Sequence, residues 1–182
     1  MTNRRSFLAT LAGGAAAAGI PLAAAPKPKP RSAPDVALLN IALEIEHTAI
    51  FAYGLAAGSG LLSKGVLSVG GLFKASHESH RAALTAVIQQ AGGFPMAPRK
   101  EYDLSAFDLK TEVDVLRLAL FLEMKAARTY QKAISQFHNA KLLDAAARIM
   151  GDEVSHAAVL RGALGKGPVR FYGQLDEEGF GS

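Results

Sequence analysis

The chain has 182 residues, of which 49% are hydrophobic and 20% are charged, so it is long enough for one domain and too apolar to be disordered. It contains no cysteine, which excludes disulfides, thiolate metal sites and a cysteine nucleophile. Five of the 20 Lys and Arg residues, but none of the 16 Asp and Glu residues, lie in residues 1–33. The remainder therefore carries a net charge of about −1, and nucleic-acid binding is not expected.

Residues 1–25 have the pattern of an export signal. Arg4 and Arg5 precede Phe7 and Leu8, and an apolar stretch of Ala, Gly and Leu follows. This resembles a bacterial twin-arginine signal, and the alternative is a basic flank on an ordinary secretory signal. We expect a periplasmic or secreted protein with no integral membrane domain after processing. Cleavage near residue 25 and retention of the segment as an anchor both remain open.

Four helices are predicted after the leader. Residues 26–34 are a linker rich in Pro and Lys, residues 35–165 form the bundle, and residues 166–182 form a tail. Asp35 is expected to cap the first helix, and glycines follow the first, second and fourth helices. Absence of Trp and richness in Ala and Leu also favour an all-α fold. The predicted helices cover residues 36–57, 61–91, 111–137 and 140–164.

Connection lengths predict how these helices are arranged. A short Gly-Ser-Gly loop joins the first two helices, which should therefore pack antiparallel. The segment 92–110, which follows the second helix, is long enough for the chain to cross the length of a bundle. The expected architecture is an antiparallel four-helix bundle with a long crossover between its second and third helices.

Each predicted helix carries an apolar stripe at three- and four-residue spacing, and polar groups interrupt every stripe near its middle. Carboxylates and imidazoles ordinarily avoid such positions, because burial removes their hydration. The interrupting groups are Glu46 on the first helix, His77 and His80 on the second, Glu123 on the third, and Glu153 and His156 on the fourth.

The three carboxylates lie at similar depths in the bundle. Glu46, Glu123 and Glu153 each stand about three helical turns past the expected start of their helix. Their positions relative to those starts differ by no more than two places in the chain, which is about 3 Å at a rise of about 1.5 Å per residue. The polar groups can therefore meet in one layer.

An internal repeat supports the same layer. The segment EHTAIFAY at residues 46–53 is matched by EMKAARTY at residues 123–130, and HESHRAAL at residues 77–84 is matched by EVSHAAVL at residues 153–160. The offsets of the two matches differ by a single position, so the chain reads as a duplicated helical pair. Pseudo-twofold symmetry would place the polar groups of the two halves face to face.

These motifs resemble the ferritin-like superfamily, especially its small exported and desiccation-related domains, over about residues 35–165. The resemblance implies a ferritin-like bundle in which two helices each give one Glu, and the other two each give a Glu-x-x-His pair, to two metal ions. Glu46 and Glu123 match the single-Glu positions. Glu153 and His156 match one Glu-x-x-His pair, and His80 matches the second histidine.

The match breaks at His77, which stands where the pattern has a bridging carboxylate. Carboxylate oxygens and imidazole nitrogens suit iron, manganese or zinc, and spacing of three residues puts both members of a pair on one helix face. A neutral imidazole bridges two metals less well than Glu does. The layer could hold one ion, hold two unequally, or have lost metal, with Fe or Mn as the expected cofactor. Glu78, the nearest alternative carboxylate, lies one residue off the stripe.

Two tyrosines lie near the polar layer. Tyr53 and Tyr130 each follow a stripe glutamate by seven residues, on the same helix face. They could donate hydrogen bonds to the carboxylates from outside the ligand shell, act as redox-active phenols, or simply pack in the core. Glu44, His47 and Asp152 lie off the stripes and are expected to be solvated.

Two functions are compatible with these features. The first is an exported di-metal protein with ferroxidase, peroxide-removing or other oxidoreductase activity, whose partners are metal ions. The second is a metal-free ferritin-like structural or stress protein without catalysis. Iron storage in a cage ranks third, because it needs subunit surfaces that the sequence does not reveal. A homo-oligomer remains possible for each.

Overall fold

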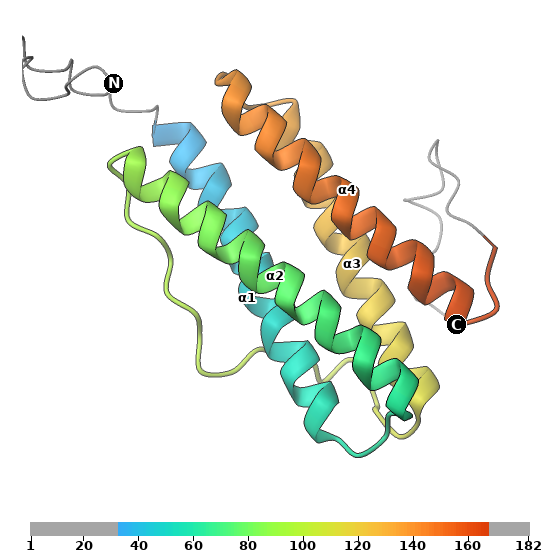
Figure 1. Cartoon of the computed structure of the whole chain (residues 1–182). Helices are drawn as coiled ribbons and strands as arrows, with labels where there is room; N and C mark the ends of the chain where they lie inside the picture. The colour runs from blue at the N-terminus through green and yellow to red at the C-terminus, as the bar shows by residue number, and fades with distance from the viewer. Residues whose placement is uncertain (1–32, 168–182) are drawn as a thin grey trace, which may run out of the picture.

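The computed structural model describes residues 33–167, and the predicted signal, most of the linker and most of the tail lie outside these residues. The described part consists of four helices joined by loops (Figure 1). The predicted all-α four-helix bundle is therefore confirmed. The helices are α1 (Ala33–Gly58), α2 (Lys64–Gln90), α3 (Glu112–Ile134) and α4 (Ala140–Ala163).

The helices form two antiparallel hairpins linked by a long crossover. α1 packs mainly against α2, α3 packs mainly against α4, and α1 also contacts α3. The crossover leaves the end of α2 and runs along the outside of the bundle to the start of α3 (Figure 1). α2 and α3 therefore begin at the same end, where the Ser63 backbone N–H donates to Glu112 Oε2 at 2.5 Å. α2 and α4 have few contacts with each other, so the seam between them is the loosest in the bundle.

Side-chain caps determine where three helices begin. Ser63 and Asn139 accept hydrogen bonds from the first turns of α2 and α4, and Thr111 forms a reciprocal capping box with Asp114 at the start of α3. α1 begins at Ala33, three residues earlier than predicted, because Pro34 is tolerated in a first turn. Asp35 therefore lies inside that turn and is not its cap.

Glycines end three of the helices as predicted. Gly60, Gly92 and Gly165 have φ of 73°, 75° and 68°, the left-handed conformation that glycine adopts without a Cβ penalty. Glycines inside α2 do not interrupt it, and the helix runs unbroken through Gly65, Gly70 and Gly71. Tertiary packing offsets their low helix propensity.

Two apolar clusters fill the bundle on either side of its middle. One cluster surrounds Leu43, Ile88 and Tyr130, and the other surrounds Tyr53, Phe73 and Leu120. Ile88 is fully buried, whereas the neighbouring Val87 is only partly buried. The clusters belong to opposite ends of the helices, which leaves the central layer for the polar groups.

The crossover is fixed to the bundle by apolar and polar contacts. Leu104 and Phe107 pack against Leu118 and its neighbours on α3. The Asn40 side chain donates to the Phe94 carbonyl at 3.1 Å and accepts from the Met96 backbone N–H at 2.7 Å. The crossover therefore covers the outer faces of both α1 and α3.

Two of the residues expected to be solvated lie on α1 and have partners in the crossover, which covers that helix. His47 is buried, with Nε2 3.1 Å from the Met96 carbonyl oxygen. Glu44 forms an ion pair with Arg99 of the crossover at 2.7 Å. The expectation of solvation is wrong for His47, since a helix-by-helix reading does not include the loop that packs over it.

Among the described residues, one helical segment, Pro34–Gly58, is long and apolar enough to cross a membrane by length and composition alone. In the bundle this segment packs against α2 and α3 and buries Glu46 in the central layer.

Two glycine substitutions test this packing. A Cβ added at Gly93 would lie 2.6 Å from Val36 Cγ1 and 3.2 Å from Ile88 Cγ2, so we expect Gly93→Ala to lower the free energy of unfolding by about 1–3 kcal/mol. Gly151 lies within α4 with no atom inside 4 Å of an added Cβ. Gly151→Ala should raise the free energy of unfolding by about 0.5–1 kcal/mol. Urea unfolding monitored by circular dichroism measures both, and equal effects of the two substitutions would contradict the packing.

Candidate metal centre

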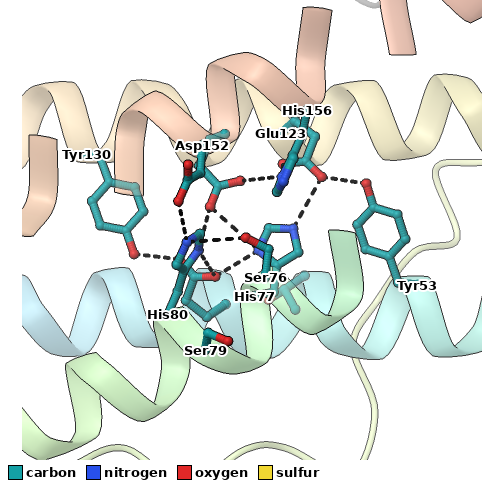
Figure 2. Close-up of polar contacts among 12 residues, drawn as sticks. Tyr53, Ser76, His77, Ser79, His80, Glu123, Tyr130, Asp152 and His156 are labelled. Atoms are coloured by element: carbon teal, nitrogen blue, oxygen red, sulfur yellow. Dashed lines mark hydrogen bonds and ion pairs between the residues drawn. The ribbon is translucent and has the colours of Figure 1, made fainter. Parts of the chain in front are cut away.

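All six predicted polar residues meet in one layer across the middle of the bundle (Figure 2). Every helix contributes, because each carries its polar groups at the same depth and on the face that points inward. Glu46, His77, Glu123 and Glu153 are fully buried, and His80 and His156 are nearly so. The layer is therefore shielded from solvent on both sides by the two apolar clusters.

His77 occupies the centre of the layer. Its Nδ1 lies 2.8 Å from Glu46 Oε2, and its Nε2 lies 3.2 Å from Glu123 Oε1. The imidazole thus joins the single glutamates of the two halves. Glu153 Oε1 lies 3.6 Å from the same Nδ1. The ring therefore also faces Glu153, the residue that corresponds to His77 in the other half of the repeat.

The other two histidines flank this centre on opposite sides. His80 Nδ1 lies 3.0 Å from Glu153 Oε1 and 3.6 Å from Glu46 Oε2. His156 Nδ1 lies 3.3 Å from Glu123 Oε2, and its ring stacks on Phe73 with a centroid distance of 4.1 Å. His156 Nδ1 also lies 3.6 Å from Glu153 Oε2, so each of these histidines is held against two carboxylates.

The tyrosines donate hydrogen bonds across the two halves of the chain. Tyr53 Oη donates to Glu123 Oε1, and Tyr130 Oη donates to Glu46 Oε1, each at 2.5 Å. Each phenol therefore donates to the glutamate of the other half of the repeat. In the sequence, each tyrosine instead follows the glutamate of its own half. These hydrogen bonds orient the two carboxylates.

One residue near the layer was not predicted to take part. The Asp152 carboxylate is exposed, yet its Oδ2 lies 3.2 Å from His80 Nε2 (Figure 2). Its partner is on α2, across the seam that separates the hairpins. The sequence signal is weak, because Asp152 lies one residue off the α4 stripe. Glu78 does lie outside the layer, where it pairs with Lys74 at 2.6 Å.

The buried carboxylates and imidazoles shift one another's protonation. Burial alone would lower the pKa of His77, but its hydrogen bonds to Glu123 and Glu46 and the negative charges of Glu123 and Glu153 outweigh it and raise this pKa to about 10. The same competition raises the pKa of His80 to about 10 and that of His156 to about 9. Hydrogen bonds from the imidazoles overcome burial and lower the pKa of Glu46 and Glu123.

Burial is the main cause of the pKa shift of three other groups. Burial raises the pKa of Glu153, and the neighbouring Glu123 adds to this effect. Burial and the adjacent carboxylates raise the pKa of Tyr53 and Tyr130 well above the ordinary value. Both phenols therefore remain hydrogen-bond donors at neutral pH.

The donor set fits metal ions. Within the described residues two sets of four ligand atoms each lie within 4.8 Å of one another. Glu153 Oε1 and His80 Nδ1 lie 3.0 Å apart as an ion pair, but neither of these atoms nor Glu153 Oε2 makes a hydrogen bond of suitable geometry. Buried polar atoms without partners are rare, and a cation would satisfy these. The sets are Glu46, His77, His80 and Glu153, and His77, Glu123, Glu153 and His156.

Comparison with known proteins agrees with this architecture. The sequence matches the family described as Ferritin-like domain over residues 34–166. No curated protein matches the sequence. The fold is similar to the crystal structure of a conserved hypothetical protein from Mycobacterium tuberculosis, with a TM-score of 0.68 and 23% identity over 75% of this chain and 94% of that chain. The chain therefore belongs to the ferritin-like domain family.

Proposed function

We propose that this protein is exported and binds one or two metal ions, Fe or Mn, in the polar layer, where it carries out oxidation chemistry with dioxygen or peroxide. The observation that supports the proposal most is the pair of overlapping ligand sets, together with the carboxylate of Glu153 that has no hydrogen-bond partner. Such an ion would supply electron exchange with a small oxidant.

The residues of the layer would have different roles in holding metal. Glu153 belongs to both sets and can give one oxygen to each, whereas a neutral His77 has a single lone pair and can complete only one. The two positions are therefore unequal. Tyr53 and Tyr130 orient the glutamates through their hydrogen bonds, and the apolar clusters exclude water from the layer.

A second candidate is a ferritin-like structural or stress protein without metal. It is favoured by the raised pKa of the three histidines, because three imidazolium ions would balance three carboxylates with no cation. A metal ion must displace these protons to bind. The two candidates differ in whether the purified chain contains metal, and in what the layer contributes to stability.

Metal analysis tests the proposal directly. Purified full-length protein should contain at least about one Fe or Mn per chain, or take it up on addition, and metal at about 100 times the dissociation constant should raise the free energy of unfolding by about 2.7 kcal/mol. Glu153→Gln should abolish both effects, because it removes the carboxylate shared by the two sets. Elemental analysis and thermal unfolding are the measurements.

His77→Glu serves as the matched variant in the same experiment. It restores the carboxylate that the symmetric pattern has at this position, so the two unequal metal affinities should become more nearly equal. Metal content well below one per chain, unrestored by either metal, would reject the proposal. In that case Glu123→Gln with Glu153→Leu should raise stability, since replacing buried ionic groups by apolar ones can stabilise by about 1–4 kcal/mol.

Removal of one phenol hydroxyl tests the role of the tyrosines. Tyr53→Phe keeps the ring but removes the donor to Glu123, so we expect metal affinity to fall by about 10–100-fold. Tyr102→Phe is the control, because its hydroxyl accepts from the Arg99 backbone N–H in the crossover, away from the layer. Calorimetric metal titration measures both variants. Equal affinities for Tyr53→Phe and the unmodified protein would show that Tyr53 only packs.

Export is tested at the paired arginines. Replacing Arg4 and Arg5 together by Lys should retain the protein in the cytoplasm if the leader is read by the twin-arginine pathway. An ordinary secretory signal would tolerate this change, because Lys preserves its positive charge. Fractionation of cells followed by immunoblotting distinguishes the two outcomes.

A further inference from the structure

The bundle contains an apolar cavity of about 180 Å³ beside the polar layer. All four helices contribute to its lining, and every lining residue except Tyr53 and Lys74 is apolar. The Tyr53 hydroxyl donates to Glu123, and the Lys74 ammonium pairs with Glu78. The cavity therefore presents no unpaired polar side chain to a ligand.

The internal repeat provides a reference for this cavity. Its lining residues Tyr53, Leu116 and Ala119 correspond, in the alignment of the two halves, to Tyr130, Leu39 and Ala42 at the other end of the bundle. The cavity at that end has a volume of only about 30 Å³. The same architectural position is therefore open in one half of the duplicated fold and nearly filled in the other.

Three matched positions carry smaller side chains beside the larger cavity, although others, such as Val159 against Ala83, carry larger ones. At matched positions of the repeat, Ala57, Val66 and Gly70 line the larger cavity, whereas the other end has bulkier residues. A Cβ at Gly70 would lie 3.8 Å from Tyr53 Cδ1, an ordinary contact, so sterics do not require glycine there. The larger counterparts are Ile134, Leu142 and Ala146, which pack in or against the cluster around Tyr130.

The lining determines which class of molecule fits. Water needs polar partners that this surface lacks, whereas an apolar cavity of about 150 Å³ can hold a benzene-sized molecule. Leu67, Val69 and Val159 line the cavity and are also exposed, so the cavity has an apolar opening at the α2–α4 seam. Exposed apolar side chains around a concave surface are typical of ligand-binding positions.

We propose that this cavity binds a neutral apolar molecule of about the size of one aromatic ring or a short hydrocarbon chain. Tyr53 and Phe73 line the cavity, and they also contact Glu123 and His156 of the polar layer. A bound molecule would therefore lie one side chain away from the candidate metal centre. The inference goes beyond the proposed metal function, because binding requires no metal.

Toluene, titrated into metal-free full-length protein, tests the cavity. We expect saturable shifts of the methyl resonances of Val66, Leu116 and Val159 in carbon–proton correlation spectra, with a rise in unfolding temperature. Pyrimidine, a polar ring of similar size, should shift none of these resonances. Because metal is absent, failure of the metal proposal does not affect the result.

A filled variant provides the decisive comparison. The triple substitution Ala57→Ile, Val66→Leu and Gly70→Ala copies the side chains of the other end and should abolish toluene binding without lowering the unfolding temperature. Gly70→Ala alone, a milder change, should weaken binding. Ala83→Val is the control, since Ala83 lines the smaller cavity at the other end and its substitution should leave binding unchanged.

Three kinds of result would overturn the proposal. The first is a failure of the binding test, either no saturable shift with toluene or equal toluene binding by the filled variant. The second is nuclear Overhauser contacts from Phe171 or Tyr172 to the Val66 methyls, which would make the chain's own segment 168–182 the occupant. The third is a concentration-dependent increase in molecular size that changes the same methyl resonances, which would make a second copy of the chain the occupant.

Discussion

The structure depends on the compensation of three carboxylates buried at the centre of an apolar bundle. An uncompensated carboxylate in such a place is far less stable than in water, so positive charge must be supplied locally. Three protonated imidazoles can supply this positive charge, and a metal ion could supply it instead. The same requirement explains why every helix has its polar groups at one depth, between two apolar clusters.

The layer also ties the two helical hairpins together. Tyr53 donates to Glu123 and Tyr130 donates to Glu46, so neither half satisfies its own single glutamate. Contacts between α1 and α3 bring these partners into register, whereas α2 and α4 contact each other little. The layer is therefore complete only when the two halves are docked, and the α2–α4 seam is the least packed route toward it.

Pseudo-twofold symmetry is broken at two places that bear on function. In the layer, His77 faces Glu153, its counterpart in the repeat, and this makes the two ligand sets unequal. Beside the layer, the cavity next to Tyr53 is open where its counterpart next to Tyr130 is nearly filled. Both differences distinguish one side of the layer from the other.

The sequence alone determined the helix class, the crossover and the six residues of the layer, because helical periodicity and the internal repeat are properties of the chain order. It could not determine to which glutamate each tyrosine donates, or that the crossover buries His47. It also could not show that Asp152 lies within hydrogen-bond distance of His80. These contacts join segments that only docking brings together. The cavity is likewise tertiary, since its volume depends on how side chains from four helices fill a shared space.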